Sequence, residues 1–342
     1  MSMLSLETLW YIVVIASLIF YAVLDGFDLG VGCLHLCSYK DEERRVFLNA
    51  IGPVWDGNEV WIVVIGGALF AGFPNVFATL FSAFYNFTML LLFGLIFRAV
   101  AIEFRSKHDS YKWRRNWDIA FSLASYIIAF GCGLVLGNLI EGIPLDKNKD
   151  FVGTTFGFLK PYSLLVGLTS VSLFAMHGAI YLVMKTEKTL HNHMRKWAKR
   201  CIVLFIISDF ALTLATFYIA PHMLNRLFDH PLLFLIPLFG FLSILIIPTL
   251  LKKHYDGYAF IASSLGIALF LILFAVSLFP TMIRSSIAPE TNSLSVYNSS
   301  SSPLTLKVLL IIVLIGIPLV LAYGFYIYRI FRGKVRLEKT SY

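Results

Sequence analysis

Ionisable side chains in otherwise apolar segments are the residues of this 342-residue chain with the greatest capacity for chemistry. Asp25 and Asp28 stand three residues apart in Asp-Gly-Phe-Asp, and Asp56 and Glu59 have the same spacing in Trp-Asp-Gly-Asn-Glu. This spacing places both members of each pair on one face of a helix. Arg98 is the fifth such residue. Carboxylates in an apolar segment are suited to taking up and passing on protons, with the guanidinium as their charge partner.

The histidines and cysteines give little sign of a metal or haem site. Among eight histidines, only His177 lies deep in an apolar segment. A membrane haem held by two histidines needs two that face each other at similar depth. We therefore expect no metal in this chain, with His177 as the only weak candidate. The four cysteines form no Cys-x-x-Cys pair, and no phosphate-binding loop, dinucleotide fingerprint or metalloprotease motif is present.

The composition indicates that membrane-spanning helices position these residues. Hydrophobic residues make up 58% of the chain, charged residues 14%, and the mean hydropathy is +0.79. A soluble protein of this size needs roughly 25% charged residues, whereas a spanning helix needs about 20 mostly apolar residues. The sequence thus predicts an all-α polytopic membrane protein with a single membrane domain, 1–342. Nine spans are predicted, at about 8–32, 51–71, 76–102, 117–139, 162–185, 201–220, 232–251, 258–279 and 305–331.

The distribution of Lys and Arg predicts the orientation of these spans. With nine spans, the two termini lie on opposite sides of the membrane. One side, which includes the tail 332–342 and, at their helix ends, Lys185 and Arg329, carries 21 of the 28 Lys and Arg; the other side carries six, and Arg98 lies deep within a span. The positive-inside rule then places the N-terminus outside and the C-terminus in the cytoplasm. The net charge of +8 reflects this topology, so no nucleic-acid partner is expected.

In this orientation the ionisable residues fall in one layer near the cytoplasmic surface. Asp56 lies about five residues, or ~8 Å, into the second span, and Arg98 lies late in the third. Four acids around one Arg would leave about three uncompensated negative charges at low dielectric, so some of the acids are expected to carry protons. The predicted cytoplasmic proton path comprises Asp56, Glu59, Asp25, Asp28 and Glu103, with Arg98 as charge partner and Trp55, Asn58 and Trp61 in support.

Two other interpretations of the same layer remain open. The polar residues could form a contact with another subunit or with quinone, or a structural salt bridge of Arg98 with one aspartate. Glycines in the first two spans, namely Gly26, Gly30, Gly32, Gly66 and Gly67, favour close helix packing over a functional role.

Three motifs carry a resemblance to a known family. They are Asp25-Gly-Phe-Asp-x-Gly-Val-Gly, Glu43-Arg-Arg and Trp55-Asp-Gly-Asn-Glu-Val-Trp. The likeness continues through 66–71, 104–107, 113–118 and 137–139. With these motifs, the sequence resembles subunit II of the cytochrome bd quinol oxidases over essentially the whole chain.

The resemblance implies two four-helix bundles, about 8–139 and 162–279, and a peripheral ninth helix at about 305–331. It implies a partner, subunit I, which holds haem b, haem d and the quinol-oxidising loop. Complexes of this family lie in the bacterial inner membrane, oxidise quinol, reduce oxygen to water and take protons from the cytoplasm. Asp56 matches the family's proton-path aspartate. From the resemblance we also expect further partners, namely a structural quinone in this subunit, small single-helix subunits and membrane lipid.

A proton-coupled secondary transporter is the main alternative from another functional class. It would be expected to show inverted repeats and broken helices near the midplane of the membrane. The charges here lie off-centre, and no repeat is apparent. A purely structural subunit without a proton role is a third hypothesis, which mutation of the acids would separate from the first.

Overall fold

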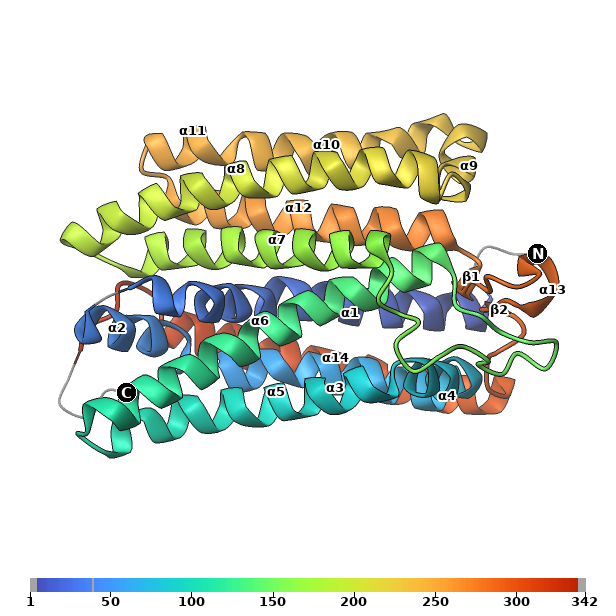
Figure 1. The fold of residues 1–342 in the computed structure, drawn as a ribbon, viewed down its shortest axis with the longest axis horizontal. Helices are drawn as coiled ribbons and strands as arrows, with labels where there is room; N and C mark the ends of the chain where they lie inside the picture. Colours follow the sequence, from blue (N-terminus) through green and yellow to red (C-terminus); the bar gives the residue numbers. More distant parts are fainter. Residues whose placement is uncertain (1–4, 39, 338–342) are drawn as a thin grey trace.

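Helices that run along one long axis make up almost all of this computed structural model, which describes residues 5–38 and 40–337 (Figure 1). Short helices and a two-stranded sheet close its ends. The elements in chain order are α1 (Leu6–Leu34), the 3₁₀ turn η1 (His35–Cys37), α2 (Asp41–Ile51), α3 (Trp55–Gly72), α4 (Pro74–Ala83), α5 (Tyr85–Phe104), the 3₁₀ turn η2 (Arg105–Lys107), α6 (Tyr111–Glu141), α7 (Pro161–Lys185), α8 (Lys188–Ile219), α9 (His222–Asp229), the 3₁₀ turn η3 (Pro231–Phe234), α10 (Leu235–Leu245), α11 (Ile247–Lys252), α12 (Asp256–Leu278), β1 (Thr281–Ile283), α13 (Pro289–Asn292), β2 (Leu294–Ser295) and α14 (Pro303–Ile330).

Among the described residues, eight helices are long and apolar enough to cross a membrane, and α2 with α3 supplies a ninth if this bent pair is one span. The pair bends by 53° at Gly52 and Pro53. Proline has no amide hydrogen to donate, so Pro53 interrupts the backbone hydrogen bonds that a continuing α2 would need. Because α3 therefore begins at Trp55, Asp56 stands in its first turn. The depth predicted for Asp56, about five residues inside a span starting at 51, stays a prediction, because the described helices do not fix where the membrane begins along this bent pair.

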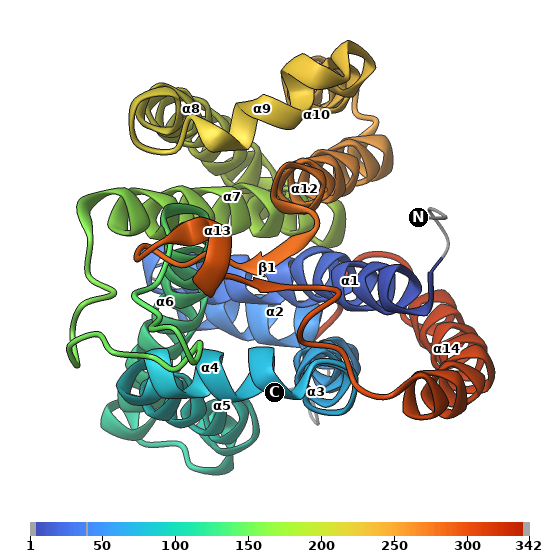
Figure 2. The ribbon, with the colours of Figure 1, turned by 90° about the vertical axis from the view of Figure 1, so that its right-hand side faces the viewer.

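The predicted third span, 76–102, is wrong at its start, because two helices cover this segment. Figures 1 and 2 show α4 lying across the long axis, whereas α5 runs along it and crosses the membrane. The helix breaks at Phe84, where neither proline nor glycine marks the boundary. Since α4 is as apolar as a true span, hydropathy alone could not separate the two helices. Arg98 consequently lies in the second half of the crossing helix α5.

The first helix, α1, occupies the centre of the molecule (Figure 2). It contacts α3, α6, α7 and α12, while α5 packs on α6, α8 on α7, and α10 on α12. The last helix, α14, lies beside α1 and α3. This arrangement matches the predicted all-α membrane fold. The division into two four-helix bundles stays a prediction, since α1 and α6 also contact α7 across the proposed boundary.

The crossing of α1 and α7 depends on glycines at which the two backbones touch. A Cβ atom on Gly30 would lie 1.8 Å from the Phe174 carbonyl oxygen, and one on Gly178 would lie 2.4 Å from the Gly30 carbonyl carbon. Small residues permit such close approach of helices in membranes. The expected close packing is therefore found at Gly30. At Gly66 and Gly67 no helix of the described chain comes this close, because none of its atoms lies within 4 Å of a Cβ placed there.

We expect Gly30→Ala to destabilise the fold strongly. Overpacking a core usually costs about 1–3 kcal/mol, and here the added methyl group meets rigid backbone rather than a side chain that could move. The measurement is the melting temperature of the purified protein. Gly67→Ala adds the same methyl group to a helix where nothing lies within 4 Å, so it should melt like the wild type. Equal melting temperatures for the two variants would refute this account of the crossing.

A small sheet and loops cover the end of the molecule that carries α9 and α13 (Figure 1). β1 and β2 pair antiparallel, and Ile143 forms an isolated bridge with Ser285. Asn292 donates to the Leu145 carbonyl oxygen at 3.0 Å, which connects the loop after α6 to the segment after α12. These contacts hold the two longest connections together.

Candidate functional site

Arg98 is the centre of the predicted charged layer, and its side chain is completely buried. Its two Nη atoms donate to the two carboxylate oxygens of Asp25, one of them at 3.0 Å. Nη1 also donates to Glu59 Oε2 at 3.4 Å. A two-pronged guanidinium–carboxylate contact is among the stronger polar interactions in proteins. The pairing that the sequence led us to expect for Arg98 is thus found, on Asp25, which α1 presents to α5.

Asp28 forms a separate hydrogen-bonded chain that reaches the last helix. Its Oδ2 accepts from Asn58 Nδ2 at 2.7 Å, and Asn58 Oδ1 accepts from the Tyr328 hydroxyl at 2.8 Å. Asp28 Oδ1 is buried and has no hydrogen-bond partner within the described part of the chain. Asp28 therefore retains one oxygen that can accept a proton or a water hydrogen. Tyr328 was missed by sequence reasoning, since a tyrosine near the end of a span has no distinguishing spacing.

Asp56 and Glu59 occupy the edge of this site rather than its interior. Asp56 is exposed in the first turn of α3 and shares no hydrogen bond with Arg98. The Glu59 side chain is 18% exposed while it contacts Arg98, so it lies between the surface and the buried group. The structure thus gives an order from Asp56 outside, through Glu59, to the buried pair of Asp25 and Arg98.

The remaining predicted residues lie around this site in different roles. Trp61 is buried and stacks on Phe20, with ring centroids 4.5 Å apart. Trp55 is partly buried and packs against the core at the start of α3. Glu103 is partly buried in the last turn of α5. The two tryptophans therefore pack α3 against its neighbours and contribute to the predicted site by holding this helix in position.

A second buried ionic cluster surrounds Asp118 on α6, and sequence reasoning did not predict it. Asp118 accepts from Arg105 Nε at 2.5 Å and from Arg44 Nη1 at 3.0 Å, and it lies 2.6 Å from His35 Nε2. Arg105 also pairs with Asp41 at 2.6 Å. Asp118 follows the start of its predicted span by one residue, so the rule that charge in a span needs a partner could have found it.

Asp209 is a further acid that the sequence reasoning missed. It lies within the apolar segment of α8 and is partly buried. The same rule could have identified it, because its neighbours Ile206, Ile207 and Phe210 are apolar. It stands on α8, whereas the Arg98 site is formed by α1, α3 and α5, so it is not part of that site.

His177 has no ring nitrogen free for a metal. Its Nδ1 lies 2.7 Å from Ser263 Oγ and its Nε2 lies 3.0 Å from the Val23 carbonyl oxygen. The ring is fully buried and stacks on Phe260, with centroids 4.8 Å apart. In the described ranges, no group of three or more His, Cys, Asp or Glu side chains is arranged to hold a metal ion. A haem ligated by His177 does not fit this structure.

Comparisons with known proteins agree with one another. The sequence matches the family described as cytochrome bd terminal oxidase subunit II over residues 6–331. It is 32% identical to the cytochrome bd-I ubiquinol oxidase subunit 2 of Escherichia coli K12 over 97% of this chain and 96% of that one. It is 34% identical to the cytochrome bd ubiquinol oxidase subunit 2 of Bacillus subtilis 168 over 97% and 98%.

A solved structure shares the fold. The bd oxidase of Geobacillus thermodenitrificans contains a chain that superimposes with a TM-score of 0.79, at 20% identity, over 96% of this chain and 99% of that one. This match supports the membrane fold, and the sequence matches favour an oxidase subunit over a secondary transporter. The chain therefore belongs to the cytochrome bd terminal oxidase subunit II family.

Proposed function

We propose that this chain works with a haem-bearing subunit I in a complex that oxidises quinol and reduces oxygen to water, and that it supplies the cytoplasmic proton-uptake path. The observation that carries the proton role is the order of acids around Arg98. Asp56 is exposed, Glu59 is partly exposed, and Asp25 and Asp28 are buried. The names of the relatives, which specify ubiquinol oxidases, support the reaction.

In this proposal, protons enter the path at Asp56. The carboxylate accepts a proton from cytoplasmic water and passes it to Glu59, one helical turn further along α3. Glu59 shares Arg98 with Asp25, so a proton that reaches Glu59 weakens its hold on the guanidinium while Asp25 keeps its two hydrogen bonds. Arg98 thus continues to stabilise the negative charge of the Asp25 carboxylate. The open oxygen of Asp28 offers a second buried acceptor.

The orientation in the bacterial inner membrane is part of the proposal. The excess of Lys and Arg at one end of the helices supports a cytoplasmic C-terminus and an external N-terminus. In this orientation Asp56 begins its helix at the cytoplasmic side. An exposed carboxylate next to a span is costly in lipid, so we place subunit I and interfacial water, rather than acyl chains, against this face of α3.

The haems belong to subunit I in this proposal, because His177, which lies deep in a span, has both ring nitrogens engaged by protein groups. The relatives' names support a quinol substrate but place neither the quinone nor the haems in this subunit. A structural quinone and small single-helix subunits stay expectations from the family resemblance.

Co-expression with subunit I tests the proposed function. The purified complex should show reduced-minus-oxidised haem b and haem d bands and should consume oxygen when quinol is added. This chain purified alone should show no stoichiometric haem, and His177→Ala should leave the haem content of the complex unchanged, because both ring nitrogens already have protein partners. A haem band in the isolated chain that disappears in His177→Ala would reject the assignment to subunit I.

A further inference from the structure

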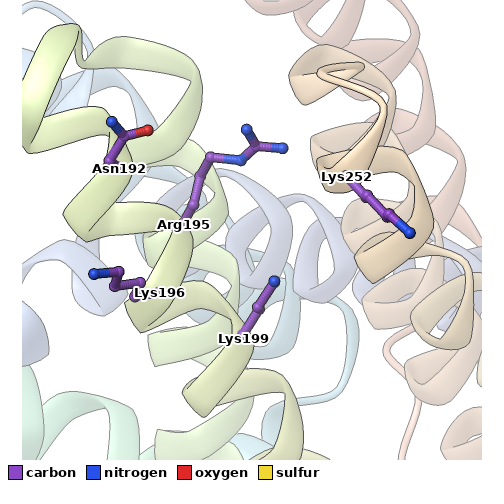
Figure 3. A pocket seen from close by; sticks show the side chains of 5 residues that line it. All are labelled: Asn192, Arg195, Lys196, Lys199 and Lys252. Carbon is purple, nitrogen blue, oxygen red and sulfur yellow. The ribbon is translucent and has the colours of Figure 1, made fainter.

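A basic pocket lies between α8 and α11, at the end of the molecule opposite the one that carries α9 and α13 (Figures 1 and 3). Its volume is about 460 Å³, within the range of about 300–1,000 Å³ that is usual for small-molecule sites. Figure 3 shows Arg195 and Lys199 extending from α8 toward α11, which carries Lys252. The lining residues are Asn192, Arg195, Lys196, Lys199 and Lys252.

The four cations of this pocket have no carboxylate to neutralise them. In the part of the chain that the structure describes, no ion pair involves any of them. Arg195 donates instead to His254, at 3.0 Å from Nδ1. Basic residues at other helix ends differ, since Arg44 and Arg105 both pair with Asp118. Positive-inside topology requires basic residues at this side but does not require four of them to line one pocket without an acid, so the pocket favours an anion.

The pocket stands where the apolar part of each helix begins. Lys252 is the last residue of α11, and Lys199 precedes the long apolar segment of α8. On α8, Val203 and Ile207 follow Lys199 at helical spacing, and their side chains are 56% and 62% exposed. On α10, Leu245 and Leu238 precede Lys252 at seven-residue intervals, and they are also exposed. An exposed apolar stripe therefore leads from the pocket along α8, and a second lies on α10, the helix that directly precedes α11.

We propose that this pocket binds the phosphate of an anionic phospholipid headgroup, with the acyl chains lying along the two stripes. Basic pockets between spanning helices at the cytoplasmic side are suited to acidic headgroups. A free phosphate would use the same cations but would have no use for the apolar stripes. The stripes are the reason for choosing the lipid as the occupant. The site lies on helices other than those that carry Arg98, so its occupancy is separate from the proposed proton path.

Phosphatidylglycerol added to the detergent-purified complex with subunit I is the probe, and the melting temperature and lipid retention by native mass spectrometry are the readouts. The wild type should retain phosphatidylglycerol and melt at a higher temperature with it, whereas phosphatidylcholine should have no such effect. The variant Arg195→Gln/Lys199→Gln/Lys252→Gln should bind phosphatidylglycerol about tenfold or more weakly, because each basic residue near an anionic lipid contributes to its attraction.

The matched control is Lys107→Gln/Lys112→Gln/Arg115→Gln, which removes three exposed charges on the same side but away from the pocket. It should bind phosphatidylglycerol like the wild type. Equal loss of binding in both triple variants would overturn the proposal, since it would indicate general charge attraction. In a second experiment, inorganic phosphate at millimolar concentration replaces the lipid. A rise in melting temperature equal to that caused by phosphatidylglycerol would reject the lipid as the occupant. If the first variant does not assemble, Lys199→Gln/Lys252→Gln provides the same comparison.

Discussion

Arg98→Leu is expected to prevent assembly of the complex with subunit I. The substitution leaves the carboxylate of Asp25 without the guanidinium that contacts both its oxygens, at a position where both side chains are fully buried. Removing one partner of a buried ion pair costs about 3–5 kcal/mol, because the remaining charge stays at low dielectric. This is a large part of the ~5–15 kcal/mol by which a typical protein is stable. The amount of complex purified from membranes measures the effect.

A charge-neutral double variant separates loss of pairing from loss of packing. Arg98→Leu combined with Asp25→Leu removes both charges of this ion pair, so it should recover a substantial part of the assembly that Arg98→Leu loses. Arg115→Leu removes an arginine that is exposed on α6 and should assemble like the wild type. Normal assembly of the Arg98→Leu single variant would show that the Asp25–Arg98 pair does not stabilise the fold.

Asp56→Asn is expected to assemble normally, with full haem content, and to reduce oxygen about tenfold or more slowly in steady state, since a positioned proton-transfer group typically contributes about 10²–10⁴-fold. Asparagine keeps the size of the side chain and can still form hydrogen bonds, but its amide group cannot take up and release a proton as a carboxylate does. Because Asp56 is exposed and forms no ion pair with Arg98, its replacement should leave the buried ionic contacts unchanged. Quinol-driven oxygen consumption by the purified complex is the measurement.

Two variants make the Asp56 result specific. Asp56→Glu retains a titratable carboxylate near the same place and should keep part of the activity. Glu42→Gln neutralises an exposed acid on the neighbouring helix α2 and should turn over like the wild type. A fully assembled Asp56→Asn complex that turns over at the wild-type rate would exclude the proton role and leave Asp56 as an exposed surface residue of α3.

The membrane class, the approximate spans and the layer of charges could all be predicted from the order of residues alone. A run of apolar residues has few alternatives to a spanning helix, because backbone groups in lipid must be paired internally. An isolated charge within a span is likewise costly, so Arg98 requires a partner in whatever way the helices pack. These inferences depend only on how far along its helix each residue lies, and this distance follows directly from the residue number because a helix rises about 1.5 Å per residue.

The tertiary structure was needed for everything that depends on rotation about the helix axes and on which helices are neighbours. It selected Asp25 rather than Asp28 as the partner of Arg98, brought Tyr328 from the last helix to Asn58, and left Asp56 on the surface. It also separated α4 from α5 at Phe84, where neither proline nor glycine marks the break, and left the apolar helix α4 lying across the molecule instead of spanning. Residue spacing places a side chain at a depth and on a face of its own helix, but only the packing of that helix against the others decides what the face meets.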